Sequence, residues 1–262
     1  MSLIEHLTEL RTRLIRCVIA VVLGAIAVWV FFDPIFDFLS EPYCSLRSDD
    51  VSVLIAELEL GDAEAAALED ADCNFLMTRP LEGFSVQLTM SGYGGLILAL
   101  PVILYQIGRF VLPGLYPHEK KAVLPFFAMS VILLFAGMTL GYLFLPRALE
   151  VLTTEFGSDR FQAFFSPQEY LDFFVKMVLA FGLAFELPLI LVFLQLTGLV
   201  QTATLRRNRR VAIVLVVIAA AIITPTGDPF TLGALGIPMY VFYELSLIIG
   251  GRMTKKRQLA QA

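Results

Sequence analysis

The residue in this sequence best placed to do chemistry is an acid inside an apolar run. Glu186 lies near the middle of residues 170–197, which are long and apolar enough to cross a bilayer. A charge at that depth costs at least ~3 kcal/mol, so an ionisable residue there indicates a function by default. Pro188 cannot donate a backbone N–H to the carbonyl of Ala184, so we expect the helix to be loosened beside the acid.

No second group that would complete a catalytic or metal site accompanies this acid. The only two histidines, His6 and His118, lie far apart in the sequence, and the three cysteines match no metal or redox spacing. An intramembrane hydrolase would need a nucleophile with a base, or paired aspartates at one depth. The sequence offers neither, and it has no P-loop. We therefore expect a protein that is not an enzyme and that holds no metal or cofactor.

The elements that must position Glu186 are membrane spans. The 262 residues are 58% hydrophobic and only 16% charged, which is too apolar for a soluble domain. We predict an all-α, polytopic membrane protein that forms a single integral membrane domain over residues 1–262. Its six spans are expected at about 14–32, 84–108, 122–145, 170–197, 211–223 and 232–249. The last two are short for a ~30 Å hydrocarbon core, which predicts local thinning of the bilayer or shelter behind neighbouring helices.

The first residues predict an amphipathic arm. Within residues 3–16, four leucines fall on one helical face, while Glu9 and Arg13 lie opposite with i,i+4 spacing. We expect this arm to lie along the membrane surface and to run into the first span.

The charges are sorted by loop, and this sorting predicts the topology. The N-terminus, the 109–121 loop, the 198–210 loop and the tail carry 14 of the 19 Lys and Arg residues. The positive-inside rule therefore places both termini in the cytoplasm. The 33–83 loop, with 13 Asp and Glu, then faces outward. A disulfide between Cys44 and Cys73 is allowed in that compartment, although their spacing cannot establish it.

Several segments resemble the TatC family, the core subunits of the twin-arginine protein translocase. The segments are HLTELRTRL at 6–14, PVILYQIGRFVLPGLYPHEKK at 101–121, AFGLAFELP at 180–188, LRRNRR at 205–210, and TP–D with a downstream IPMY at 224–240. The acidic insert around residues 44–76 and the tail are not covered. Gly227 stands where the family usually has proline, and Leu232 where glutamine is common, so the last outward turn departs from the pattern.

The resemblance implies a fold and a function. The fold would be a concave, glove-like arrangement of six spans in the cytoplasmic membrane. The protein would be a receptor that binds the twin-arginine signal peptides of folded cargo at its cytoplasmic face. It would assemble with single-span partners of the TatA/TatB type and with further copies of itself. Transport would be driven by the proton gradient, without nucleotide and without any nucleic-acid partner.

The resemblance also assigns roles to residues at the cytoplasmic edge. Carboxylates are natural bidentate partners for guanidinium groups, and the family pattern places signal recognition at Glu9 and Glu119, with Arg11 and Phe110 beside them. The alternative is that each acid only neutralises nearby bases, Arg13 in the case of Glu9. Arg11 is expected to orient the acids rather than to contact the signal. Phe110 on its own is simply an interfacial aromatic.

Two further acids carry alternatives of their own. Glu186 is either a buried acid hydrogen-bonded within the bundle, to Gln195 or Gln106, or a polar anchor for a partner's span, which the resemblance supports. Asp228 lies in a proline-flanked outward turn, where aspartate commonly caps the backbone, and the family pattern implies that this turn also shapes the outer cap. We assign no role to Glu244, which could snorkel or pair with Arg252.

A second function class remains open on the residues alone. An ion-coupled secondary transporter could use Glu186 as its proton site. Such a protein should show an internal repeat with discontinuous helices in matching halves. We find no such repeat, and the charges within the spans do not converge from several helices.

Overall fold

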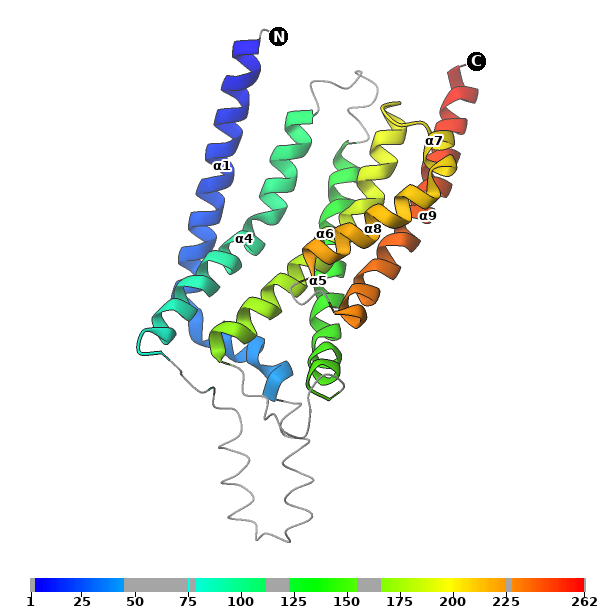
Figure 1. The fold of residues 1–262 in the computed structure, drawn as a ribbon. Coiled ribbons are helices and arrows are strands. Elements are labelled where there is room, and N and C mark those ends of the chain that lie inside the picture. The colour runs from blue at the N-terminus through cyan, green and yellow to red at the C-terminus, as the bar shows by residue number, and fades with distance from the viewer. Residues whose placement is uncertain are drawn as a thin grey trace. The chain divides into compact units, whose positions relative to one another are not determined.

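The computed structural model describes residues 3–44, 75, 79–111, 123–154, 166–224 and 228–261, and these residues contain no strand. A turn at Phe31 follows α1, and residues 32–44 after it are helical. Figure 1 shows the other helices in chain order: α1 (Leu3–Val30), α4 (Glu82–Val111), α5 (Val123–Thr154), α6 (Pro167–Leu196), α7 (Thr202–Arg207), α8 (Arg209–Ile223) and α9 (Pro229–Gln261). The predicted all-α class is confirmed.

Five of the described helices are long and apolar enough to cross a membrane. They are α1, α4, α5, α6 and α9, each with at least 26 residues in the candidate span. At about 1.5 Å per residue, such a span exceeds the ~30 Å hydrocarbon core. Helix α8 is apolar but has only 15 residues. The chain is therefore a multi-span membrane protein in which one helix is too short to cross a bilayer of ordinary thickness.

The prediction of two short helices is correct for α8 and wrong for α9. Helix α9 runs for 33 residues, starting before the apolar run that begins at Leu232 and continuing past Ile249 into the basic tail. Pro238 lies inside it, which an α-helix tolerates in a membrane when neighbouring groups satisfy the freed backbone. The tail, rich in Lys, Arg, Gln and Ala, consists of strong helix formers, so the helix continues after hydrophobicity ends.

The amphipathic arm does not form a separate helix. Residues of the arm and of the first span belong to one uninterrupted helix, α1, with no turn near Leu14. The sequence between them contains no Gly, Pro or capping residue that would end a helix, which explains the continuity. The expectation that the arm runs into the first span is confirmed, and α1 has no break that would let the arm turn along the membrane surface.

The chain divides into two compact units, and the first consists of Val21–Leu98 and Leu143–Val175. In this unit α1 and α4 approach at their backbones. A Cβ on Gly95 would lie 2.5 Å from the backbone nitrogen of Ala25, and one on Gly24 would lie 2.8 Å from the carbonyl oxygen of Gly95. Nearby, the Tyr170 hydroxyl donates to the Leu39 carbonyl at 2.7 Å. Small residues thus permit a contact that holds the helix pair together.

This backbone approach gives a testable consequence. We expect Gly95→Leu to destabilise the protein by several kcal/mol or to prevent its accumulation, because no rotamer can relieve a clash that begins at Cβ. Gly92→Leu, at a glycine with open space around it, is the matched control. Thermal unfolding in detergent, followed by size-exclusion chromatography, measures the difference. Equal stability of the two variants would contradict the packing argument.

The second unit consists of Met1–Ala20, Ala99–Tyr142 and Lys176–Ala262. Here α5 and α6 pack through glycines, since a Cβ on Gly137 would lie 2.6 Å from the Phe181 carbonyl oxygen. Helices α8 and α9 lie side by side, coloured orange to red in Figure 1. This unit contains the predicted site residues that the structure describes, namely Glu9, Arg11, Phe110, Glu186 and Asp228.

Within the second unit, α6, α7 and α9 are tied together by one amide. Gln195 is 2% exposed. Its Nε2 donates to the carbonyls of Leu191 and Ser246, both at 3.1 Å, and its Oε1 accepts a hydrogen bond from Thr202 Oγ1 at 2.8 Å. Gly250 makes room for it, because a Cβ there would lie 2.6 Å from the amide atoms. Each polar atom of this side chain is satisfied.

The structure describes only one of the two cysteines of the expected disulfide. Cys44 is disulfide-bonded and Cys17 is free. Cys73, the expected partner of Cys44, lies outside the described residues.

Candidate functional site

Glu186 is buried in α6, with 5% of its surface exposed. Its Oε2 accepts a hydrogen bond from Ser130 Oγ on α5 at 2.6 Å. Its Oε1 is buried and has no hydrogen-bond partner among the described residues. Buried carboxylate oxygens are nearly always satisfied, so an unsatisfied one marks a place where another group can bind.

The partner of Glu186 was not anticipated from the sequence. Gln195 and Gln106 had been expected, but Gln195 is used between α6, α7 and α9, and Gln106 accepts a hydrogen bond from Arg13. Ser130 could have been identified from its expected depth in the membrane. It is the only hydroxyl in the first half of the third apolar run, and helices joined by a short loop run antiparallel, which places it level with the middle of the next one.

The helical face around Glu186 continues as an apolar surface. Leu183 and Ile190 lie three residues before and four residues after the acid, and therefore on the same side of α6. They are 49% and 55% exposed, although both are large aliphatic side chains inside a membrane span. Phe185 packs instead against Phe242 of α9, with ring centroids 4.5 Å apart. The two aliphatic side chains on the same side of α6 as the buried acid are thus not covered by the described parts of the chain.

A second cluster lies where α1 and α4 meet. Arg13 Nε donates to Glu9 Oε1 at 3.1 Å, and its Nη1 donates to Gln106 Oε1 at 3.3 Å. One turn along each helix, the rings of His6 and Phe110 stack with centroids 4.6 Å apart. Glu9 and Phe110 are thus brought to one surface, by side chains at i,i+3 spacing on α1 and i,i+4 spacing on α4.

The contacts of Glu9 agree in part with both alternatives, neutralisation of Arg13 and recognition of a signal peptide. It neutralises Arg13 through an i,i+4 ion pair, as the simpler interpretation requires. Both hydrogen bonds from Arg13 go to Oε1, and Oε2 accepts no hydrogen bond from the residues that the structure describes. Glu9 is half-buried. One oxygen is therefore fixed by Arg13, while the other remains able to accept.

One residue of the predicted recognition set, Arg11, does not join this cluster. Arg11 is exposed and lies two residues from Glu9, on a different side of α1, and it forms no ion pair with any described residue. Glu119 lies outside the described residues. Gln106, His6 and Arg13 contribute instead, and the sequence signal for Gln106 was its single amide in the apolar run at 101–111.

Asp228 caps the start of α9. Its Oδ1 accepts hydrogen bonds from the backbone N–H groups of Phe230 at 3.0 Å and Thr231 at 2.9 Å, and Thr231 Oγ1 contacts Oδ2. These contacts satisfy N–H groups that have no partner within the helix, which is the usual contribution of an N-cap aspartate.

Glu244 is paired, but not with Arg252. Arg209 Nη2 donates to it at 2.7 Å, and the Tyr240 hydroxyl donates to it at 3.1 Å. The contact joins the first residue of α8 to α9. The alternative of a pair with Arg252 is wrong, because Arg209 reaches Glu244 across the helix pair.

Among the described residues, no three His, Cys, Asp or Glu side chains lie close enough together to hold a metal ion.

Comparison with known proteins identifies the family. The family model described as Sec-independent protein translocase protein (TatC) matches residues 5–238. The chain is 37% identical over 261 residues to the Sec-independent protein translocase protein TatC of Magnetococcus marinus, covering 99% of the chain and 88% of that relative. It is 38% identical to the protein of the same description from Frankia casuarinae, covering 95% of the chain but only 65% of the longer relative.

A solved structure agrees with these relatives. The crystal structure described as the twin-arginine translocase receptor TatC superposes with a TM-score of 0.73 at 31% sequence identity, covering 95% of the chain and 99% of the solved one. The likeness therefore includes the helices that carry Glu9, Phe110 and Glu186. The chain belongs to the TatC family of Sec-independent protein translocase proteins.

Proposed function

We propose that this protein is the receptor subunit of a twin-arginine translocase. It spans the cytoplasmic membrane, and both of its termini lie in the cytoplasm. The observation that carries the proposal is the surface of His6, Glu9, Gln106 and Phe110 between α1 and α4. It combines a carboxylate oxygen that can still accept hydrogen bonds with an aromatic pair. A signal peptide that presents two guanidinium groups and an apolar stretch fits that chemistry.

The ion pair with Arg13 helps this surface rather than blocking it. Arg13 fixes the carboxylate of Glu9 through one oxygen and holds α1 against α4 through Gln106. A guanidinium of the signal can then donate to Oε2 without first ordering the acid, so less conformational entropy is lost on binding. Glu119 is proposed as the second acid, and Arg11 as a residue that orients the recognition surface.

Glu186 is proposed to bind a single-span partner of the TatA/TatB type. The supporting observations are the buried Oε1 with no partner and the uncovered aliphatic side chains of Leu183 and Ile190 on the same face. A polar residue in the middle of a partner's span would satisfy Oε1, and its apolar neighbours would cover the aliphatic pair. This accounts for an acid that would otherwise be costly to keep in the membrane.

The remaining parts of the proposal concern energy and assembly. The protein binds no nucleotide and gathers partners for export driven by the proton gradient, and it works in a complex with further copies of itself. A secondary transporter with Glu186 as its proton site has no comparable support, since the relatives are described as translocase proteins.

The experiment that tests the proposed function compares two cargos. A precursor carrying a twin-arginine signal should co-purify with the detergent-solubilised protein, and a precursor with Lys-Lys at the same positions should be recovered at about one tenth or less, because a lysine cannot make the bidentate contact. A cytosolic protein of equal charge serves as the background. Equal recovery of the two precursors would overturn the receptor assignment.

A further inference from the structure

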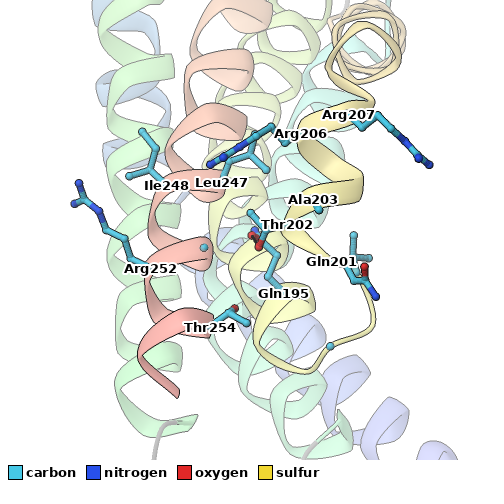
Figure 2. Close-up of a pocket in the computed structure, with 13 residues that line it drawn as sticks. Gln195, Gln201, Thr202, Ala203, Arg206, Arg207, Leu247, Ile248, Arg252 and Thr254 are labelled. Atoms are coloured by element: carbon cyan, nitrogen blue, oxygen red, sulfur yellow. Dashed lines mark hydrogen bonds between the residues drawn. The ribbon is translucent and has the colours of Figure 1, made fainter. Parts of the chain in front are cut away.

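A cavity opens in the second unit between the end of α6, the turn after it, α7 and α9 (Figure 2). Its volume is about 1260 Å³. Figure 2 shows Gln195 and Thr202 side by side between α7 and α9, with Arg206 pointing toward Leu247. It is separate from the proposed signal-binding surface and from Glu186, neither of which contributes a lining residue.

The charge of this cavity is of one sign. Arg206, Arg207 and Arg252 line it, and no lining residue is acidic. The one acid in the sequence of α9, Glu244, is already paired with Arg209. The three guanidinium groups are exposed and form no ion pair with any described residue. The cavity thus offers uncompensated positive charge.

Three of the four neutral polar side chains of the lining, all except Gln201, are already used within the protein. Thr202 Oγ1 donates to Gln195, and Thr254 Oγ1 donates to the carbonyl of Gly250 at 2.8 Å. Donors left for a ligand are therefore chiefly guanidinium groups, which favour phosphate and carboxylate and bind them bidentately. The long arginine side chains can turn toward a ligand from either side of the opening.

The cavity is also amphiphilic, and its depth matches the membrane surface. The apolar run of α9 ends near Ile249, and the lining residue Arg252 begins the basic segment that follows it. Leu247 and Ile248 line the cavity, and the exposed side chains of Leu245 and Ile249 continue the apolar surface along α9 into the span. A ligand with an anionic head and an apolar body would contact both parts.

We propose that this cavity binds the phosphodiester headgroup of an anionic glycerophospholipid, with the acyl chains lying along α9. Basic pockets between spanning helices at the cytoplasmic side have the chemistry to hold such headgroups. The position at the end of a span favours a lipid over a soluble acidic segment, because a lipid headgroup is already present at that depth. The proposal does not depend on the signal-peptide function.

The test measures lipid binding to the full chain directly. We would purify the protein in detergent and titrate it with phosphatidylglycerol or with phosphatidylcholine of the same acyl chains, following bound lipid by native mass spectrometry. Arg206→Gln should weaken phosphatidylglycerol binding about fivefold, the factor that one basic residue near an anionic surface contributes. Arg210→Gln is the matched control, since it removes an equal charge four residues later, at the start of α8, from a residue that does not line the cavity.

A second pair of variants separates space from charge. Ala203→Phe fills the cavity mouth and should lower phosphatidylglycerol binding with no change in charge, while Thr204→Phe adds the same ring outside the lining. Preference for phosphatidylglycerol that is lost in both cavity variants and kept in both controls supports the proposal.

Four results would overturn it. They are equal binding of the two lipids, unchanged binding by Arg206→Gln and Ala203→Phe, binding of glycerol phosphate alone as tight as that of the lipid, and displacement of bound lipid by a polyglutamate peptide that binds more tightly. The third would assign the cavity to a soluble phosphate, and the fourth to an acidic protein segment.

Discussion

Replacing Glu9 by Gln is expected to weaken binding of a twin-arginine signal peptide by about tenfold to a hundredfold. A hydrogen bond to a charged group contributes about 1.5–3 kcal/mol, and the neutral amide of Gln removes the charge while keeping the shape. Glu9→Asp keeps the charge on a shorter side chain and should retain more of the affinity. The combination with Glu119→Gln should abolish detectable binding. Isothermal titration or fluorescence anisotropy with a labelled signal peptide in detergent measures each affinity.

Two controls separate recognition from the ion pair within α1. Glu5→Gln removes the same charge from the same helix one turn earlier, so it reports the general electrostatic effect. Arg13→Gln breaks the contact with Glu9 but leaves the carboxylate in place. If Arg13→Gln weakened binding as much as Glu9→Gln, the acid would act only by fixing α1 against α4. If Glu5→Gln did so, the effect would be unspecific charge.

The second large effect is expected at Glu186. Glu186→Leu should lower crosslinking to a single-span partner by about tenfold, since a polar contact inside a membrane contributes about 1–2 kcal/mol. Crosslinking is best placed at Leu183, which shares the exposed face and leaves the acid intact. Export of a twin-arginine cargo should fall with it, while signal-peptide binding to the purified protein should be unchanged.

Ser130→Ala supplies the contrast for this prediction. It removes the hydrogen bond to Oε2 and keeps the carboxylate with its unsatisfied Oε1. We expect it to preserve most of the crosslinking. If it instead matched Glu186→Leu, Glu186 would serve the contact between α5 and α6 and not a partner. Crosslinks from Leu183 that reached only lipid would lead to the same conclusion.

The sequence predicted this protein best where one physical signal acts alone. Apolar length located the candidate spans, and the shortness of α8 followed from its 15 residues. The end of α9 was missed because hydrophobicity marks where a span leaves the membrane, not where hydrogen bonding along the backbone stops. For the same reason the sequence placed the start of the first span near Leu14, where amphipathicity changes, while the helix itself continues across that point.

The details of the candidate sites depend on contacts between residues distant in the sequence. The cost of a charge inside the membrane singled out Glu186, whereas its hydrogen-bond partner Ser130 lies 56 residues away in the sequence. The periodicity of one helix does not show which side of the neighbouring helix packs against it. Glu9 was singled out by its charge, whereas the roles of Gln106 and His6 depend on α1 packing against α4. Charge and depth thus identified the acids, and helix packing selected their neighbours.

The amide of Gln195 bears on how the chain is made. Its acceptor in α9, the carbonyl of Ser246, is synthesised 51 residues later than the amide itself. During that interval an amide at the end of α6 lacks a bond that it has in the finished protein, and only Thr202 and its own helix can satisfy it earlier. Membrane insertion is vectorial, so arrival of the last helix, with Gly250 leaving room for the side chain, is the step that completes this part of the protein.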